Sequence, residues 1–388
     1  MNVCFETFGC RLNRAEALEN EAACLAGGHQ VVTSHAEADL IVVRCCSVTA
    51  RAQHDCEKLI DHLRRKYPNT RVFITGCHDK ARPFKIAVSD AVPVRTARAY
   101  LKAQDGCSCR CSFCIVPRFR GASRSEPFDG VLAKASRFIE AGYREIVVTG
   151  CNLSLYSDAG RRLPELLDAL AGLDPACRIR LGSIEPGAVA EEVPAVMAAH
   201  ANFCRFLHIP VQSGSDLMLA AMKRPYRVAA IDRLIAGARK LMPDVAVGCD
   251  MISGFPGESR LDHFRSVTFL TRNTFVNVHA FPYSERPRTP AATLAGKIPP
   301  ELRRDRAREL AAVGEANRRI FAKSFLNREV EIVVEDEEKF AGWSSQYLWT
   351  RLETDEQLHD RRGKGMRRQI ARILVRNVRG DRLYGEPV

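Results

Sequence analysis

The chain has 388 residues, of which 46% are hydrophobic and 27% charged, and this composition predicts a globular protein with two or three domains. We expect neither a secretory signal nor a membrane span, because residues 1–6 lack a basic segment before an apolar one and no apolar run is long enough to cross a bilayer. Fifteen cysteines then favour a reducing, cytoplasmic setting and metal or redox use over disulfides. The net charge of +12 favours a polyanionic partner.

Residues 1–97 alternate strands with helices, a pattern that predicts a parallel α/β sheet. The expected elements are, in chain order, Val3–Phe8, Ala15–Ala26, Asp39–Arg44, Thr49–Tyr67 and Arg71–Thr75. A cysteine follows each expected strand, and the three are Cys10, Cys46 and Cys77. Because the carboxyl ends of parallel strands share one edge of the sheet, we expect these thiols to converge into one site. Buried structural cysteines are the alternative.

Residues 98–322 continue the alternation over six strands and predict an open, partial (β/α) barrel. The expected strands are Ala99–Ala103, Glu145–Thr149, Arg178–Ile184, Arg205–Pro210, Val245–Ile252 and Val276–Pro282. Helices are expected at Val131–Ala141, Arg162–Ala171 and Val228–Lys240. In barrels of this kind the catalytic loops follow the carboxyl ends of the strands.

One such loop, after the first barrel strand, carries Cys107, Cys111 and Cys114 in a C-x3-C-x2-C pattern. Three thiolates this close can hold three corners of a 4Fe-4S cluster. The fourth iron is then open to S-adenosylmethionine (SAM), which becomes a radical source. A structural zinc loop and a disulfide knot are the alternatives, but no second C-x2-C pair follows to complete a zinc site. Cys109 is an additional thiol in the loop.

Residues 323–388 follow a basic helix expected at Arg303–Phe325 and predict a small β-barrel, a fold that often binds nucleic acid. The expected strands are Glu329–Val334, Tyr347–Leu352, Ile370–Val378 and Arg382–Gly385. Basic residues gather in one segment, which suggests a nucleic-acid footprint. They are Arg361, Arg362, Lys364, Arg367, Arg368, Arg372, Arg376, Arg379 and Arg382. We take Arg367, Arg368 and Arg372 as candidate RNA contacts.

An ordered series of motifs over nearly the whole chain resembles the radical-SAM methylthiotransferase family. The motifs are Thr7–Asn13, Cys46–Thr49, Thr75–Cys77, Gln104–Gly121, Val148–Gly150, Gly182–Pro186, His208–Ser215, Gly254–Glu258 and Phe281–Ser284. The sequence departs from the family pattern in a shortened N-terminal domain that lacks one βα unit. It also departs at Cys45, which leaves the ligand open between Cys45 and Cys46, at Cys151, and at Arg288, where the family usually has glycine.

The resemblance implies an enzyme that places a methylthio group on an unactivated aromatic C–H bond, with two 4Fe-4S clusters and SAM as cofactors. Cys107, Cys111 and Cys114 would hold the radical-SAM cluster, and Cys10, Cys46 and Cys77 an auxiliary cluster that carries the sulfur. The implied partners are tRNA, bound by a C-terminal TRAM-like barrel, and an electron donor of the flavodoxin or ferredoxin type, with no DNA and no membrane. Four further residues are expected toward SAM, with structural roles as the alternative for each: Phe113, Gly150, Glu185 and Gln212.

The motifs Cys10–Asn13 and Phe281–Pro287 look most like the branch that modifies N6-threonylcarbamoyladenosine (t6A) at tRNA position 37. Arg286 could pair with the threonyl carboxylate of that base, or it could be a structural arginine in a proline-rich loop. The alternatives are a methylthiotransferase for isopentenyladenosine-37 tRNA, one for a ribosomal-protein Asp, and a non-catalytic iron–sulfur RNA-binding module. The presence of all six cysteines argues against the last.

Overall fold

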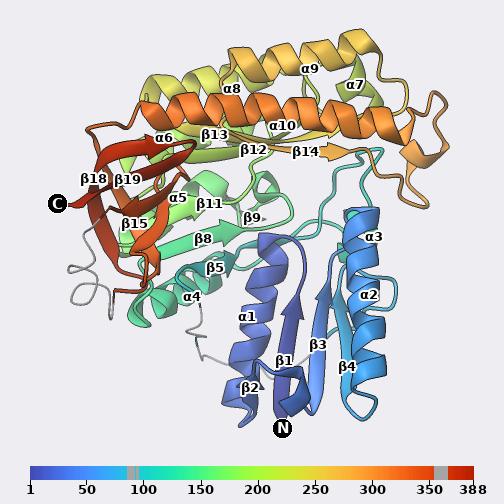
Figure 1. The fold of residues 1–388 in the computed structure, drawn as a ribbon, viewed down its shortest axis with the longest axis vertical. Coiled ribbons are helices and arrows are strands. Elements are labelled where there is room, and N and C mark those ends of the chain that lie inside the picture. The colour runs from blue at the N-terminus through green and yellow to red at the C-terminus, as the bar shows by residue number, and fades with distance from the viewer. Residues whose placement is uncertain (85–91, 93–95, 354–365) are drawn as a thin grey trace.

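In a computed structural model, which describes residues 1–84, 92, 96–353 and 366–388, four parallel strands form the N-terminal sheet in the order β2-β1-β3-β4. Their bounds are β1 Asn2–Thr7, β2 Gln30–Val32, β3 Leu40–Cys45 and β4 Arg71–Gly76. Helices α1 (Arg11–Ala26) and α2 (Ala50–Lys66) flank the sheet (Figure 1). Ala15 of α1 also packs against Tyr100 and Val147 of the next domain. The helix thus joins the sheet to the rest of the molecule.

Residues at the two ends of α2 explain where this helix begins and ends. The side chain of Thr49 accepts a hydrogen bond from the backbone N–H of Ala52 at 3.1 Å and caps the first turn. Three basic residues, Arg64, Arg65 and Lys66, occupy the last turn, where positive charge is favourable to the helix dipole. The predicted helix Thr49–Tyr67 is therefore confirmed to within one residue at each end.

One disulfide contradicts the expectation that the cysteines avoid disulfide bonds. Cys45 of β3 and Cys56 of α2 are bonded, with their Cα atoms 5.9 Å apart. Both are fully buried in the cluster of Ile41, Val43 and Ile60 beneath α2. The reason is the packing of helix on strand, which brings two side chains eleven positions apart into the separation that a disulfide requires. Composition alone could not show this pairing.

Six parallel strands form the predicted open barrel, as two three-stranded sheets in the orders β11-β8-β5 and β12-β13-β14. A parallel bridge between Ser183 and His208 continues the sheet from one set to the other. The strand bounds are β5 Ala99–Lys102, β8 Glu145–Thr149, β11 Arg178–Leu181, β12 Phe206–Gln212, β13 Ala246–Ser253 and β14 Asn277–Pro282. Most of their side chains are buried on both faces, as parallel strands covered by helices require.

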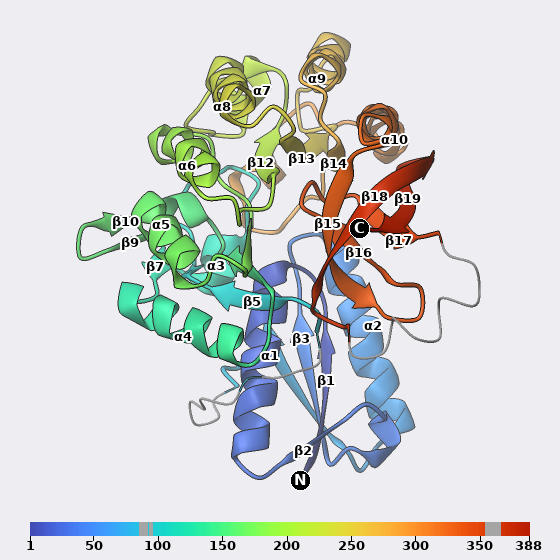
Figure 2. The same cartoon turned by 90° about the vertical axis from the view of Figure 1, so that its left-hand side faces the viewer.

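Helices cover the outside of this barrel in an arc that Figure 2 shows from α4 round to α10. Their bounds are α4 Phe128–Glu140, α5 Leu163–Leu173, α6 Ala188–Ala199, α7 Asp216–Ala221, α8 Val228–Leu241, α9 Arg260–Arg272 and α10 Pro300–Lys323. The short helix α3 (Val116–Arg120) and the pair β6 (Gln104–Asp105) and β7 (Arg124–Ser125) lie at the mouth. Within the described residues, no helix combines the length and the apolar character of a membrane span.

The C-terminal strands close into a small barrel in the order β15-β16-β17-β19-β18. The bounds are β15 Glu329–Asp336, β16 Ala341–Ser344, β17 Trp349–Leu352, β18 Ile370–Arg379 and β19 Arg382–Pro387. Its core includes Ile332, Ile373 and Leu383. The four predicted strands are present, and the fifth, β16, was not predicted.

A buried charged cluster joins this barrel to the central domain. Glu145 accepts hydrogen bonds from Arg180 (Nε to Oε1, 2.7 Å) and Arg178. Arg180 also donates to the backbone carbonyl of Ser344 at 2.9 Å, and Arg178 to that of Glu331 at 2.7 Å. Burial alone would raise the pKa of Glu145, but the guanidinium groups around it hold that pKa well below its usual range. Groups from both domains are therefore needed to complete the hydrogen bonding of these buried charged side chains.

Candidate functional site

Cys10, Cys46 and Cys77 lie at the carboxyl edge of the N-terminal sheet, which faces the central barrel (Figure 1). Cys10 is the residue before α1, Cys46 follows β3 and Cys77 follows β4. The N–H of Cys77 donates to the carbonyl of Cys45 at 3.0 Å, which holds the last two strand ends together. The pKa of Cys46 is raised to about 11, mainly by burial and in smaller part by the neighbouring thiols of Cys10 and Cys77. The topology thus brings the three thiols together, as predicted.

Gly9 explains how the chain approaches Cys46 so closely. Its φ is +94°, and a Cβ at this position would lie 2.5 Å from Cys46 Cβ and 2.7 Å from its Sγ. Only glycine fits this contact. Cys45 points into the core and is bonded to Cys56, whereas the Cys46 thiol is free. This geometry supports the motif register in which Cys46, and not Cys45, belongs to the site.

Arg120 connects this triad to the start of the cysteine loop. Its Nε donates to Cys77 Sγ at 3.1 Å, its Nη1 to Asp105 Oδ1 at 3.0 Å and its Nη2 to Asn13 Oδ1 at 2.6 Å. Glu16 of α1 also accepts from both terminal nitrogens, at 3.0 and 3.1 Å. Arg120 belongs to the motif Gln104–Gly121, but its role was not predicted from the sequence. The Arg120 guanidinium therefore contacts one thiol of the N-terminal triad and Asp105, which lies two residues before Cys107.

The cysteine loop is anchored from behind by Ser112. Its N–H donates to the carbonyl of Met222 at 3.0 Å and its hydroxyl to that of Ala221 at 2.8 Å. The N–H of Ala291 donates to the Ser112 carbonyl at 2.8 Å. Ser112 is buried, and the sequence analysis missed it. These bonds fix the loop between Cys111 and Cys114 on the barrel.

Arg224 is a second residue that sequence reasoning missed. Its Nη1 donates to Cys111 Sγ at 3.0 Å, and it forms an ion pair with Glu185. Its Nε donates to the Tyr226 hydroxyl at 2.7 Å. Burial raises the pKa of Glu185 to about 7, although Arg224 opposes the shift. Glu185, predicted to contact SAM, therefore has a structural partner.

The thiols of the loop differ in their environments. Burial raises the pKa of Cys114 to about 12 and also raises that of Cys111, which Arg224 opposes. A hydrogen bond with the Cys109 thiol lowers the pKa of Cys107 to about 6. Asn152 donates from Nδ2 to Cys109 Sγ at 3.6 Å, so the additional thiol has its own partner. Arg224 thus donates to Cys111 of the triad, and Asn152 donates to the additional thiol Cys109.

The structure gives the surroundings of the other residues predicted to contact SAM, and their contact with SAM stays a prediction. Phe113 is half-buried and packs against the apolar cluster of Met218, Met222, Phe255, Tyr283 and Ala291. A Cβ at Gly150 would lie 2.9 Å from Gln104 Cβ, so this glycine permits the close approach of two strand ends. Gln212 ends β12 with φ +68°. His208 is buried, and its Nε2 lies 3.2 Å from Asp250 Oδ1.

Each cysteine triad offers three soft thiol donors, the ligand type that holds iron–sulfur clusters. Of the described residues, only Cys4, Glu6 and His35 bring three possible metal ligands within 4.8 Å of one another.

The predicted substrate contacts have different environments. Arg286 is buried, donates to Gln53 of α2, and its Nε has no hydrogen-bond partner among the described residues. Arg288 has φ +68°, a conformation that favours glycine and accounts for the family's preference there.

The arginines of the C-terminal barrel are less available than the sequence suggested. Arg368 donates to the Thr96 carbonyl at 3.1 Å, and Arg372 pairs with Glu331 at 3.3 Å. The backbone N–H of Arg367, which is exposed, donates to Glu337. Glutamates distant in sequence therefore offset part of the local charge. Arg361, Arg362 and Lys364 lie outside the described residues.

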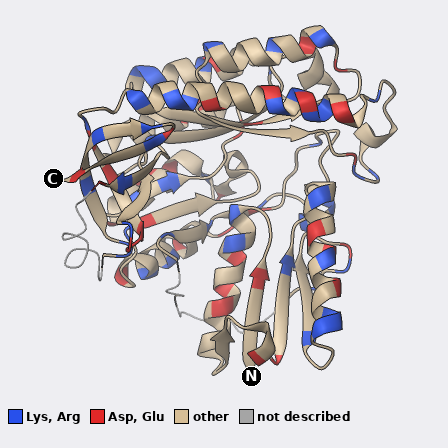
Figure 3. Cartoon of the chain, viewed as in Figure 1, with Lys and Arg blue, Asp and Glu red and all other residues tan. Residues whose placement is uncertain are grey.

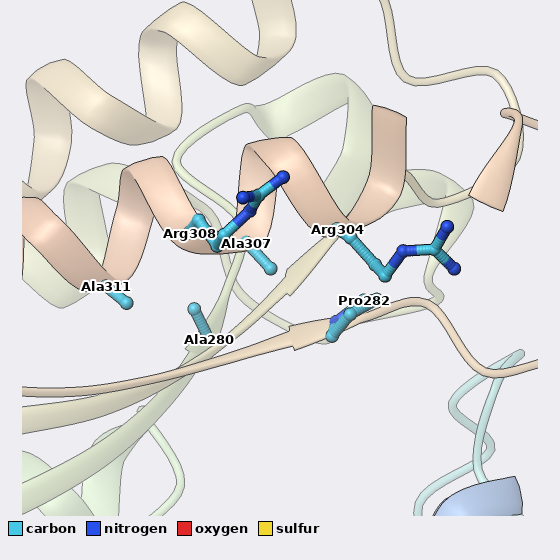
Figure 4. Close-up of a pocket in the computed structure, with 6 residues that line it drawn as sticks. All are labelled: Ala280, Pro282, Arg304, Ala307, Arg308 and Ala311. Carbon is cyan, nitrogen blue, oxygen red and sulfur yellow. The ribbon is translucent and has the colours of Figure 1, made fainter. Parts of the chain in front are cut away.

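An open groove of about 570 Å³ separates the edge strand β14 from α10. Figure 4 shows Arg304 and Arg308 of α10 above Ala280 and Pro282 of β14. Both arginines are largely exposed, and among the described residues each forms an ion pair with an acidic residue three positions before it. Further basic side chains follow along α10 (Figure 3). This groove is a cationic surface that the sequence analysis did not single out.

Comparison with known families agrees with this architecture. A model of the radical SAM superfamily matches residues 101–269, and one described as Uncharacterized protein family UPF0004 matches residues 2–94. An open parallel barrel with a three-cysteine loop at its mouth, together with the first match, defines a radical-SAM protein.

Curated relatives identify the family of radical-SAM proteins to which the chain belongs. The chain is 30% identical over 365 residues to threonylcarbamoyladenosine tRNA methylthiotransferase MtaB of Chlamydia pneumoniae, covering 84% of this chain and 85% of the relative. It is 28% identical over 404 residues to the MtaB of Bacillus subtilis (strain 168), covering 89% of each. It is 30% identical over 438 residues to tRNA-2-methylthio-N(6)-dimethylallyladenosine synthase of Chlorobium chlorochromatii, covering 98% of this chain and 96% of the relative. The chain belongs to the radical-SAM methylthiotransferase family, whose cofactors are SAM and two 4Fe-4S clusters.

Solved structures support the fold. Two structures of the radical S-adenosylmethionine methyltransferase TsrM from Kitasatospora setae give TM-scores of 0.56 and 0.54 at 14% and 15% identity. Each alignment covers 75% of this chain, and 77% and 75% of the solved chains. At this identity the likeness concerns the fold alone.

Proposed function

We propose that this protein is a tRNA methylthiotransferase that adds a methylthio group to C2 of t6A at position 37. Family membership and two separate cysteine triads joined through Arg120 support the reaction class. Curated relatives of both the threonylcarbamoyl and the dimethylallyl type match at similar identity, so their names do not choose the base. The preference between these two modified bases must therefore be argued from the residues of this chain.

The six cysteines are proposed as the cluster ligands. Cys107, Cys111 and Cys114 would hold the cluster that binds SAM, and Cys10, Cys46 and Cys77 the auxiliary one. When bound, SAM and its cluster supply homolytic removal of a hydrogen that no side-chain base could take as a proton. Arg224 and Arg120 donate to one sulfur of each set and so offset thiolate charge.

The unpartnered Nε of Arg286 is the observation that carries the choice of base. Its side chain is buried, and no carboxylate among the described residues lies within ion-pair distance. Burial lowers its pKa, and the carboxylates of Asp79 and Glu57 and the thiol of Cys46 oppose that shift from beyond ion-pair distance. A buried donor without an acceptor is costly, and a substrate carboxylate would satisfy it. The threonyl carboxylate of t6A is such a group, and an isopentenyl group is not.

Further features suit a polyanionic substrate. The groove between α10 and β14 carries Arg304 and Arg308, and the chain as a whole has a net charge of +12. A closed five-stranded barrel follows at the C-terminus. We assign tRNA to these surfaces and an electron donor of the flavodoxin or ferredoxin type to the reducing step.

The test compares three tRNA substrates with the reconstituted enzyme under anaerobic conditions: one carrying t6A, one carrying isopentenyladenosine and an unmodified transcript. Nucleoside mass spectrometry should detect the methylthio product only with the first. Arg286→Gln should lower kcat/KM for the t6A substrate by about tenfold to a hundredfold, the value of one charge-assisted hydrogen bond. Arg286→Lys keeps the charge but loses the planar fork and should fall between.

Equal activity on isopentenyladenosine would contradict the choice of base. Activity on a ribosomal protein alone would contradict tRNA as the substrate. Iron bound without any SAM cleavage would favour a non-catalytic RNA-binding module.

A further inference from the structure

Three side chains of the N-terminal domain, outside both cysteine triads, bring different metal-ligating atoms close together. The sulfur of Cys4, a carboxylate oxygen of Glu6 and a ring nitrogen of His35 all lie within 4.8 Å of one another. In the described part of the chain, no other group of three such side chains meets this limit. The function proposed above gives none of the three residues a role.

The fold of the first strands accounts for this cluster. Cys4 and Glu6 are two positions apart in β1, so their side chains point to the same face of the sheet. This is the face that α2 covers, because Cys4 packs in one apolar cluster with Cys56 of that helix. His35 begins the short helix η1 (His35–Glu37), which follows β2, the strand that pairs with the first half of β1. The parallel pairing of β1 and β2 thus brings His35 to the two side chains of β1.

Hydrogen bonds fix the positions of these side chains. Nε2 of His35 lies 2.7 Å from Oε1 of Glu6, and the Cys4 thiol donates to the carbonyl of Thr33 at 3.9 Å. Cys4 is 2% exposed, whereas the side chains of Glu6 and His35 are 36% and 26% exposed. The thiol is therefore in the interior, and the carboxylate and the imidazole connect it to the solvent from which an ion would enter.

The mixture of donor atoms indicates which ion would bind. A thiolate, a carboxylate and a neutral imidazole together carry two negative charges, which suit a divalent cation. Magnesium and calcium take oxygen ligands, and iron–sulfur clusters are held mainly by thiolates. Zinc binds cysteine, histidine and carboxylate ligands together in tetrahedral sites, with water as the fourth ligand where the protein supplies three. Ligand atoms of such a site lie about 3.3–3.8 Å apart, close to the spacing of this cluster.

We propose that Cys4, Glu6 and His35 bind one zinc ion, with a water molecule as the fourth ligand. Binding releases the thiol proton to the solvent and changes no oxidation state. The ion joins β1 to the connection between β2 and β3 and so stabilises this side of the N-terminal sheet. The site is independent of the proposed function, because it uses none of the six cysteines assigned to the clusters.

The experiment uses the full-length enzyme with both clusters reconstituted anaerobically, so that the cluster thiols are not available to zinc. After equilibration with zinc chloride and desalting, metal analysis should find about one zinc per chain in addition to about eight irons. Zinc K-edge X-ray absorption should show one sulfur neighbour at about 2.3 Å and nitrogen or oxygen neighbours at about 2.0–2.2 Å.

Glu6→Gln changes a partly exposed side chain without changing its size. It should weaken zinc binding at least about tenfold and leave the iron content unchanged, because one charged ligand is lost. Zinc should raise the Tm of the wild type but not that of Glu6→Gln, since a ligand that binds only the native state stabilises it. Cys4→Ala should remove the sulfur neighbour from the absorption spectrum.

Two matched controls should bind zinc like the wild type. Cys24→Ala changes a buried cysteine of α1 that packs on the opposite face of the same sheet. Glu37→Gln changes an exposed glutamate of η1, two positions after His35.

A wild type that retains no zinc would overturn the proposal, as would equal retention by the wild type, Glu6→Gln and Cys4→Ala. Zinc with three or more sulfur neighbours would also overturn it, because the ion would then occupy a cysteine triad. A wild-type Tm that zinc leaves unchanged would show that Glu6 and His35 form an ion pair only.

Discussion

The two cysteine triads of this protein are built in opposite ways. Cys107, Cys111 and Cys114 share one loop, and Ser112 between them anchors that loop to the barrel. The other three thiols follow three different strands and meet only because those strands are parallel and in register. A site within one loop is specified locally, whereas a site at a sheet edge depends on the fold of a whole domain. Two three-cysteine sites of one protein can thus rest on very different structural supports.

The largest expected effect separates the triads by function. Replacing Cys107, Cys111 and Cys114 with Ala should abolish SAM cleavage and leave about four of about eight irons in reconstituted protein. Replacing Cys10, Cys46 and Cys77 should leave a similar iron content but retain cleavage of SAM to 5′-deoxyadenosine, with no methylthio product. Iron analysis and product chromatography measure both. Iron that is unchanged by the first triple substitution would refute the assignment of that loop.

A smaller expected effect tests whether Cys46 or Cys45 is the cluster ligand at the edge of the N-terminal sheet. Cys46→Ala should lower the iron content by about half, because a buried ligand is lost. Cys45→Ala should keep the iron but lower the free energy of unfolding by about 2–4 kcal/mol, since it opens the Cys45–Cys56 disulfide. Cys56→Ala is the matched control and should behave like Cys45→Ala. Loss of iron in Cys45→Ala but not in Cys46→Ala would reverse the register.

The smallest expected effect concerns Arg120, which connects Cys77 to the start of the cysteine loop. Arg120→Gln leaves Glu16, Asp105 and Cys77 without their shared guanidinium, whose side chain is 8% exposed. We expect a loss of about 3–5 kcal/mol in the free energy of unfolding, as for other broken buried ion pairs. Arg118→Gln, two positions before Arg120 on α3, breaks a surface ion pair with Asp79 and should cost less than about 1 kcal/mol. Denaturant unfolding measures the free energy of unfolding of both variants. Equal losses would contradict the role of Arg120 as a buried connection between the N-terminal triad and the cysteine loop.

The sequence predicted those features that depend on local pattern. The C-x3-C-x2-C loop, the six barrel strands and the three thiols at the sheet edge follow from spacing, periodicity and the geometry of parallel sheets. It did not predict Arg120 or Arg224, because their partners lie far away in the chain: Glu16 is 104 residues from Arg120 and Cys111 is 113 from Arg224. The Cys45–Cys56 bond was missed for a related reason, since it depends on how α2 packs on β3. The barrel arginines were judged by sequence neighbours, while their glutamate partners come from other strands.

The cluster of Glu145, Arg178 and Arg180 has a consequence for the evolution and engineering of this chain. Backbone carbonyls of the C-terminal barrel supply part of the hydrogen bonding that these interior charges need. Truncating the chain before Glu329 would leave two cations facing solvent through a newly opened surface, with half of their acceptors gone. The terminal barrel is therefore no interchangeable module. Fusing a different RNA-binding domain in its place would require redesigning the floor of the central barrel at the same time.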